Sequence, residues 1–348
     1  MRIGDFQLGQ GRVFIIAELS ANHNQDIQMA IDTIRAAKKA GADAIKLQTY
    51  TPDTITIDSD QKYFKIDGTI WNGRNLYDLY KEAHTPWDWH KRLFEVAEEE
   101  GLVCFSSPFD STAVNLLSEL NSPAYKIASF EIQDVGLIEY AAKQGKPIII
   151  STGIAEQDDI QLAVETCRRA GNDQIVLLKC TSSYPAPIDL ANLSTMVDMR
   201  KKYDVLTGLS DHTIGETVPI VATSLGACLI EKHFILDKSI GGPDASFSLD
   251  PKAFMKMVTE VRNAELALGK VTYEVSEKIR ASQKFGRSLF VVNDIKEGEI
   301  FTTENIRSIR PADGLHPKYL QEILGKKAHR SISRGTPLRE QDVIGLRL

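Results

Sequence analysis

Eight short apolar runs alternate with helical patterns through most of the chain, and this alternation limits the fold more than any other feature. Residues 26–41, for example, place apolar side chains three and four positions apart and close on a glycine, as an amphipathic helix does. Repeated strand-then-helix units predict a closed (β/α)8 TIM barrel. A doubly wound open sheet is the alternative, but no glycine-rich dinucleotide fingerprint follows the first run. The runs are 13–19, 43–50, 102–108, 124–129, 147–153, 175–181, 204–210 and 228–234.

The alternation stops in the last part of the chain, which predicts a second, smaller domain. We expect the barrel over residues 1–269, a polar linker over 270–285 and a cap over 286–348. Within the cap, residues 293–306 align with 330–343 at a constant offset. The repeat predicts a pseudo-symmetric module of short strands and turns, near the lower size limit for independent folding. Its matched positions are Ile295 with Ile332, Gly298 with Gly335, Phe301 with Leu338, and Ile306 with Val343.

Composition indicates a cytoplasmic protein with small-molecule partners. The net charge is −6 and no basic block occurs, which disfavours a nucleic-acid surface. No apolar run reaches membrane-spanning length, and the first residues lack a signal-peptide pattern. The four cysteines lie in or beside apolar runs without a CxxC motif, as buried free thiols in a reducing compartment do.

Polar residues close all eight runs. In a TIM barrel, the carboxyl ends of the strands carry the active site. A single such residue can be explained as a helix N-cap, but the recurrence at all eight ends predicts one shared catalytic rim. These end positions include Glu18, Lys46, Gln48, Ser107, Lys126, Ser129, Ser151, Ser210, His212 and His233.

Two histidines end neighbouring strands in the motifs "GLSDHT" and "IEKHF". His212 and His233 can therefore share one divalent cation and leave coordination positions open for a substrate. Glu231 should face the same side as His233 and support the metal site, whereas Lys232 should point away, toward a helix. Each histidine alone can equally be a core residue with a backbone partner.

Lys46 and Lys126 are expected to meet on the rim with several serine hydroxyls and form an anion pocket. One of these lysines can alternatively form a Schiff base, as in barrel aldolases, which need no metal. A third reading is a non-catalytic sugar-binding protein, although such a protein would have no need for the histidine pair.

Motifs along nearly the whole chain resemble those of the sialic acid synthase family. They are "AELSANHNQ", "KLQTY", "SSPFD", "YKIASFE", "ISTG", "CTSSYP", "GLSDHT", "EKHF" and "GGPDASFSLD", and "SIRPADGLHP" resembles the family's antifreeze-like (SAF, β-clip) cap. The resemblance implies a metal-dependent transferase that condenses phosphoenolpyruvate with an N-acetylated amino sugar. It also implies Mn²⁺, Mg²⁺ or Co²⁺ as the cation, and a domain-swapped homodimer.

The resemblance assigns roles residue by residue. His212 and His233 match the metal ligands, and Glu18 and Glu131 match carboxylates beside the reacting carbons. The family commonly has asparagine where this chain has Ser182 and threonine where it has Ser107. Arg310 matches a cap arginine that reaches the N-acyl end of the sugar. The implied phosphoenolpyruvate-binding residues are Lys46, Ser107, Lys126, Ser129, Ser151, Ser182 and Ser210, and the implied sugar-binding residues are Glu18, Gln48, Glu131, Tyr184, Asp244, Phe285 and Arg310.

Within the family, "AELSANH", "SFE" and "WNGRNLYDLY" look most like the branch that makes a bacterial nine-carbon sugar for flagellin and surface polysaccharides. This branch implies a 6-deoxy amino sugar as substrate, whose methyl group Trp71 or Phe130 is expected to contact. The branches that make N-acetylneuraminic or legionaminic acid are the alternatives.

Overall fold

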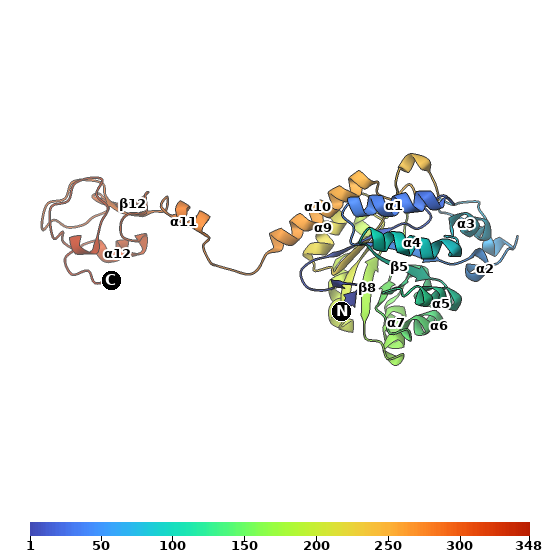
Figure 1. Ribbon diagram of the computed structural model, residues 1–348. Helices are drawn as coiled ribbons and strands as arrows, with labels where there is room; N and C mark the ends of the chain where they lie inside the picture. Colours follow the sequence, from blue (N-terminus) through green and yellow to red (C-terminus); the bar gives the residue numbers. More distant parts are fainter. The chain divides into compact units, whose positions relative to one another are not determined.

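The computed structural model describes residues 1–348 and divides into two compact units, Met1–Gly269 and Lys270–Leu348. The first unit is a closed parallel barrel in the order β10-β3-β4-β5-β6-β7-β8-β9 (Figure 1). The predicted (β/α)8 barrel is confirmed, and the open-sheet alternative is wrong because β10 pairs with β3 and closes the sheet. The barrel strands are Phe14–Glu18 (β3), Ala44–Thr49 (β4), Val103–Pro108 (β5), Tyr125–Ile127 (β6), Ile148–Ser151 (β7), Ile175–Cys180 (β8), Leu206–Asp211 (β9) and Leu229–His233 (β10).

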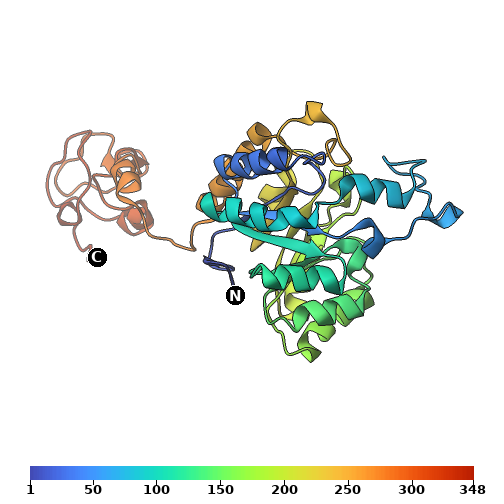
Figure 2. The same cartoon turned by 45° about the vertical axis from the view of Figure 1, so that its right-hand side comes forward.

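Helices surround the strands, and each of them buries apolar residues on one side. Helix α1, for instance, starts at Asp26, whose carboxylate accepts from the backbone N–H groups of Gln28 and Met29, and ends before Gly41 at φ +92°. Figures 1 and 2 show this outer ring. Its helices are Ile27–Lys39 (α1), Trp87–Glu99 (α4), Ser111–Glu119 (α5), Val135–Ala142 (α6), Gln157–Arg169 (α7), Ser194–Tyr203 (α8), Thr217–Ser224 (α9) and Pro251–Leu268 (α10).

A long insertion follows β4 and separates it from α4. It contains Pro52–Ile55 (α2), the 3-10 turn Lys62–Phe64 and Leu76–Ala83 (α3), and it extends to the right of the barrel in Figure 2. The sequence pattern did not predict any structure in this segment. Connections of this length at the carboxyl face of a barrel commonly shape its active site.

An N-terminal hairpin packs with the lower interior of the barrel. Its strands are Arg2–Ile3 (β1) and Phe6–Gln7 (β2), and Ile3 and Leu8 join a buried apolar layer with Phe14 and Phe105. The layer removes large apolar side chains from water, which stabilises the barrel from inside. The polar strand ends lie at the opposite, carboxyl end.

Strand β10 presents charged side chains on both of its faces. Glu231 and His233 face the barrel mouth, while Lys232 is 0% exposed on the other face and pairs with Asp211 at 2.5 Å. Lys232 also donates to the backbone carbonyls of Thr213 and Gly215. Its orientation was predicted correctly, but its partner belongs to the neighbouring strand β9 and the loop after it rather than to a helix.

The second unit has its own core and shows the predicted pseudo-symmetry. It contains α11 (Glu277–Gln283), β11 (Ser288–Val291), β12 (Ile306–Ile309) and α12 (Leu320–Ile323). Ile295 and Ile332, equivalent in the repeat, bond reciprocally through their backbones at 2.9 and 2.8 Å. Phe301 and Leu338 are both buried. Equivalent residues therefore meet each other, as a two-fold arrangement of the repeats requires.

No helix of the chain is both long and apolar enough to cross a membrane. The four cysteines are all free and buried, as expected from their apolar surroundings.

Two core histidines make the stability of the barrel unit dependent on pH. Burial lowers the pKa of His23 and of His90 to about 4. The ring Nε2 of His90 lies 2.8 Å from Thr49 Oγ1, and its Nδ1 lies 3.2 Å from the Pro86 carbonyl oxygen. Between about pH 6.5 and 4 the unfolded chain binds protons that the folded chain does not, so each histidine destabilises the fold as pH falls, by on the order of 3 kcal/mol in full.

We expect His90→Gln to remove part of this dependence, because the amide can keep a hydrogen bond but does not titrate in this range. The free energy of unfolding should be measured by denaturant titration at pH 7, 5.5 and 4.5 for parent and variant. The parent should lose more stability than His90→Gln on acidification, and a constant difference between the two would contradict the expectation. Carboxylates that titrate in the same pH range affect parent and variant alike, so their contribution cancels in the difference between the two free energies of unfolding.

Candidate active site

A cavity of about 380 Å³ lies at the carboxyl ends of the barrel strands. Its polar floor comes from the strand ends and the turns after them, and most of the residues predicted from the sequence line it. The register explains this, since Glu18 is level with Lys46 on β4 and with His233 on β10. The predicted residues in its lining are Glu18, Lys46, Gln48, Lys126, Ser129, Glu131, Ser151, Tyr184, Ser210, His212, Glu231, His233 and Asp244.

Two lysines and two carboxylates form the centre of the floor. Lys46 Nζ lies 2.6 Å from Glu18 Oε2 and 3.7 Å from Glu231 Oε1, while Lys126 Nζ lies 4.0 Å from the same Glu231 oxygen. Gln48 donates to Glu18 at 3.1 Å, and Ser210 donates to Glu231 at 3.4 Å. The charge of Glu231 is therefore balanced by two ammonium groups.

Burial shifts the ionisation of these groups in different directions. Burial would raise the pKa of Glu231, but Lys126 and Lys46 outweigh it and lower that pKa. For Lys126 burial dominates, and its pKa falls despite Glu231. Burial raises the pKa of both Glu18 and Glu131 to about 7. The floor thus holds carboxyl groups that can gain or lose a proton near neutrality, and a lysine whose charge an incoming anion would stabilise.

Serine hydroxyls surround the lysines and leave hydrogen-bonding capacity unused. Ser107 Oγ accepts from Lys46 Nζ at 3.1 Å, so it supports that lysine from below the cavity. Ser129 Oγ accepts from the Gly153 N–H at 3.1 Å. The Oγ atoms of Ser151 and Ser182 are buried without a partner. Unpaired buried polar atoms are rare in folded proteins, so the hydroxyl of Ser151, which lines the cavity, indicates a polar ligand.

Gly153 permits this crowding of hydroxyl groups. A Cβ at this position would lie 2.1 Å from Ser182 Oγ and 2.7 Å from Ser129 Oγ. Ser182 does not line the main cavity, and its hydroxyl lies next to Gly153. Its role in binding, and that of Ser107, remain predictions from the resemblance.

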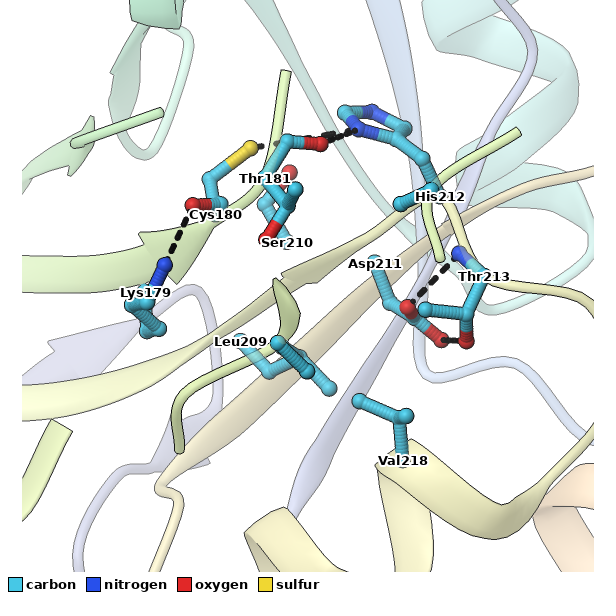
Figure 3. Close-up of a pocket in the computed structure, with 11 residues that line it drawn as sticks. Lys179, Cys180, Thr181, Leu209, Ser210, Asp211, His212, Thr213 and Val218 are labelled. Atoms are coloured by element: carbon cyan, nitrogen blue, oxygen red, sulfur yellow. Dashed lines mark hydrogen bonds between the residues drawn. The ribbon is translucent and has the colours of Figure 1, made fainter. Parts of the chain in front are cut away.

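His212 and His233 lie side by side, with ring centroids 5.3 Å apart. His212 Nδ1 lies 3.0 Å from the carbonyl oxygen of Thr181 and 3.9 Å from Cys180 Sγ, as Figure 3 shows. A void of about 10 Å³ lies beside this contact. The Thr181 carbonyl holds the Nδ1 side of the ring, which leaves Nε2 as the nitrogen available for another partner.

The histidine pair fits a cation with two protein ligands. His233 Nδ1 is buried without a hydrogen-bond partner, and the nearest carboxylate oxygen, Asp244 Oδ2, is 3.7 Å away. Burial lowers the pKa of His233 well below its ordinary value, so the ring is neutral and has a lone pair to offer. No group of three or more His, Cys, Asp or Glu side chains is arranged to hold a metal. Two imidazoles would leave the remaining positions to substrate or water.

The insertion after β4 supplies a wall that the sequence analysis largely missed. Trp71 donates from Nε1 to the Pro243 carbonyl at 3.1 Å, and its ring lies 5.6 Å from that of Tyr184. The insertion thus contacts the loops after β8 and β10. The sequence indicated this wall only through the "WNGRNLYDLY" resemblance and the expected contact of Trp71, and not through any predicted element. The apolar lining residues that it contributes are Ile55, Ile66, Trp71, Leu76, Leu79 and Ala83.

Phe285 and Arg310 lie in the second unit and do not belong to this cavity lining. Phe285 is exposed, and Arg310 follows β12 on the surface of its unit. Their contact with the sugar remains a prediction.

Comparison with known proteins supports the same interpretation. The NeuB family matches residues 33–273 and the SAF domain matches residues 286–344. Pseudaminic acid synthase of Campylobacter jejuni is 49% identical over 342 residues, covering 98% of this chain and 99% of the relative. Pseudaminic acid synthase of Helicobacter pylori is 51% identical over 330 residues, covering 94% and 97%.

A solved structure shares the fold. N-acetylneuraminic acid synthetase of Leptospira borgpetersenii superposes with a TM-score of 0.72 at 32% identity, over 81% of this chain and 94% of that one. The family match covers well over half of the chain, and the relatives span nearly all of it. The chain therefore belongs to the NeuB family of sialic-acid-synthase-type condensing enzymes.

Proposed function

We propose that this enzyme condenses phosphoenolpyruvate with 2,4-diacetamido-2,4,6-trideoxy-β-L-altropyranose and water, giving pseudaminic acid and phosphate. The observation that carries the proposal is a cavity with an ammonium and hydroxyl floor and an apolar wall, in a chain about half identical to two pseudaminic acid synthases. The floor suits a phosphorylated carboxylate, and the wall suits a sugar with methyl groups.

Phosphoenolpyruvate is assigned to the floor. Lys46 and Lys126 provide positive charge, and Ser129, Ser151 and Ser210 provide hydroxyl donors around it. The net charge of the chain is −6, so an anion would be held by these local groups and not by the general field of the protein. Binding of the anion also offsets the burial that disfavours the charge of Lys126.

The amino sugar is assigned to the space between the histidines and the insertion. Tyr184, Gln48 and Asp244 offer polar contacts there, and Trp71 and Phe130 offer aromatic surface. A 6-deoxy sugar presents a methyl where N-acetylmannosamine presents a hydroxyl. An apolar wall disfavours the hydroxyl because the hydroxyl would lose its hydrogen bonds to water without gaining a partner.

His212 and His233 would hold a divalent cation, which when bound polarises a carbonyl oxygen as a Lewis acid. In the proposed reaction, C3 of phosphoenolpyruvate forms a C–C bond to the aldehyde carbon of the open-chain sugar. Water adds at C2, and the bond between C2 and the phosphate oxygen then breaks. Glu18 and Glu131, whose pKa values are about 7, can each accept the proton of that water and release it later.

Phosphate release with a panel of amino sugars tests this proposal. We expect turnover with the trideoxy altrose derivative to exceed that with N-acetylmannosamine by at least about tenfold, because a misplaced polar group in an apolar pocket costs on the order of 1–3 kcal/mol. Faster turnover with N-acetylmannosamine or with the legionaminic acid precursor would reassign the enzyme within its family. Borohydride trapping in the presence of pyruvate is the control for an imine mechanism, and a covalent adduct on Lys126 or Lys46 would replace the proposal.

The proposed setting is a cytoplasmic homodimer that supplies activated-sugar pathways for bacterial surface or flagellar glycans. This setting follows from the family resemblance and from the relatives' activity. Nucleic acids and membranes are not proposed as partners.

A further inference from the structure

Ser20 has a backbone conformation that a serine rarely adopts. Its φ is +47°, in the left-handed region that favours glycine. The residue lies in the turn directly after β3, is 3% exposed and lines the cavity. A strained residue at the edge of a functional cavity suggests that its side chain, which glycine would lack, has a specific role.

The side chain of Ser20 has one partner. Its Oγ donates to Asp244 Oδ2 at 2.5 Å, and both groups are buried. The same oxygen, Oδ2, lies 3.7 Å from His233 Nδ1. The hydroxyl therefore holds Oδ2 on the side of Ser20 and His233, and the backbone of Ala21 also bonds to this carboxylate. Each carboxylate oxygen can accept more than one hydrogen bond, so Asp244 keeps capacity for another donor.

The loops that contain the two residues are joined independently of this contact. Asn22 donates to Ser248 Oγ at 2.8 Å and to the Phe234 carbonyl at 2.9 Å, and Ser248 donates to the Asp244 carbonyl at 2.7 Å. These bonds hold the turn of Asp244 against the turn of Ser20 outside the cavity. The backbone of Asp244 is thus held without Ser20, and the hydroxyl contributes to the orientation of the carboxylate.

We propose that Ser20 is a positioning residue, which orients Asp244 so that its carboxylate accepts a hydrogen bond from a hydroxyl or amide N–H of the amino sugar. The inference rests on the proposed function and deepens it by naming the residue that sets the geometry of one sugar contact. A carboxyl oxygen without a proton accepts hydrogen bonds, so this contact requires a donor on the sugar. Phosphoenolpyruvate, an anion held by the lysines, should not depend on Ser20.

Ser20→Gly is a clean test because glycine accepts the positive φ and removes only the hydroxymethyl group. We expect KM for the sugar to rise about tenfold, as loss of one oriented hydrogen bond to a charged group implies, with KM for phosphoenolpyruvate changed by less than about twofold. The melting temperature should stay within about 4 °C of the parent, because relief of strain offsets the lost bond. Ser20→Ala should show the same KM change with a lower melting temperature, because alanine keeps the strained φ.

Two controls separate positioning from a structural effect. Asn121→Gly changes a residue at φ +56° in the loop after α5, away from the cavity, and should leave both KM values unchanged. In an Asp244→Asn background, Ser20→Gly should have little further effect, because the two residues act through one contact. An unchanged KM for the sugar in Ser20→Gly, an equal rise for both substrates, or a full tenfold effect in the Asp244→Asn background would overturn the inference. The parent rate with each sugar reports on the proposed function, whereas only the ratio of variant to parent reports on Ser20.

Discussion

A His233→Ala variant is expected to fold like the parent and to release phosphate at least about a thousandfold more slowly. The ring offers a buried Nδ1 without a partner and lies 5.3 Å, centroid to centroid, from His212. Removing one of two protein ligands should remove the bound cation, and Lewis-acid activation is worth several kcal/mol, with each 1.4 kcal/mol corresponding to tenfold in rate. Chelation of the parent should give the same loss, and Mn²⁺, Mg²⁺ or Co²⁺ should restore it.

The matched control is His329→Ala, which removes an exposed histidine of the second unit and should retain the parent rate. Added metal should restore the chelated parent but not His233→Ala. Circular dichroism and the melting temperature check that the variant is folded. Full activity after exhaustive chelation, with residual metal measured, would refute the two-histidine site.

Two inactive variants, His233→Ala and Arg310→Ala, are expected to regain activity when they are unfolded and refolded together. The expectation rests on the proposal that Arg310 of one subunit completes the barrel site of the other in a domain-swapped dimer. The second unit is small, with only 79 residues between Lys270 and Leu348, and such a unit gains stability from contact with a larger partner. In a mixed dimer, one site then combines an intact barrel with an intact cap.

The fraction of activity regained shows whether Arg310 completes the site of its own barrel or that of the partner subunit. Random mixing makes half of the dimers mixed, each with one complete site, so roughly a quarter of all sites should be active. If Arg310 acts within its own chain, every site keeps one defect and mixing recovers nothing. Native mass spectrometry should establish that mixed dimers have formed, since absence of recovery from confirmed mixed dimers would exclude the swapped arrangement. Mixing without unfolding serves as the control for subunit exchange.

Much of the barrel and its floor could be predicted from sequence because both follow local rules. The spacing and length of the apolar runs predict each strand, and the polar residue at the carboxyl end of a strand is expected at the active-site face of the barrel. His212 and His233 could therefore be placed together from two motifs alone. The repeat in the second unit was also predicted from the sequence, and its equivalent residues Ile295 and Ile332 pair with each other.

Other features depend on contacts between distant segments, which no periodic pattern encodes. Trp71 reaches the Pro243 carbonyl across 172 positions of sequence, and Ser20 reaches Asp244 across 224. The partner of Lys232 was predicted on a helix, but it is Asp211 on the neighbouring strand, 21 positions earlier. The contacts of Lys46 and Lys126 with Glu231 likewise arise only through the closure of the barrel.

The apolar layer beneath the floor limits how substrates enter the cavity and how products leave it. Ile3, Leu8, Phe14 and Phe105 fill the lower end of the barrel, so molecules can enter and leave only past the insertion and the loops at the mouth. Lys46 and Lys126 are almost fully buried, whereas Trp71 and Tyr184 are partly exposed nearer the opening. A sugar seated against Trp71 and Tyr184 would obstruct the way down to the lysines. With the proposed substrate positions, a site open at one end only would require phosphoenolpyruvate to bind before the sugar and would release phosphate last.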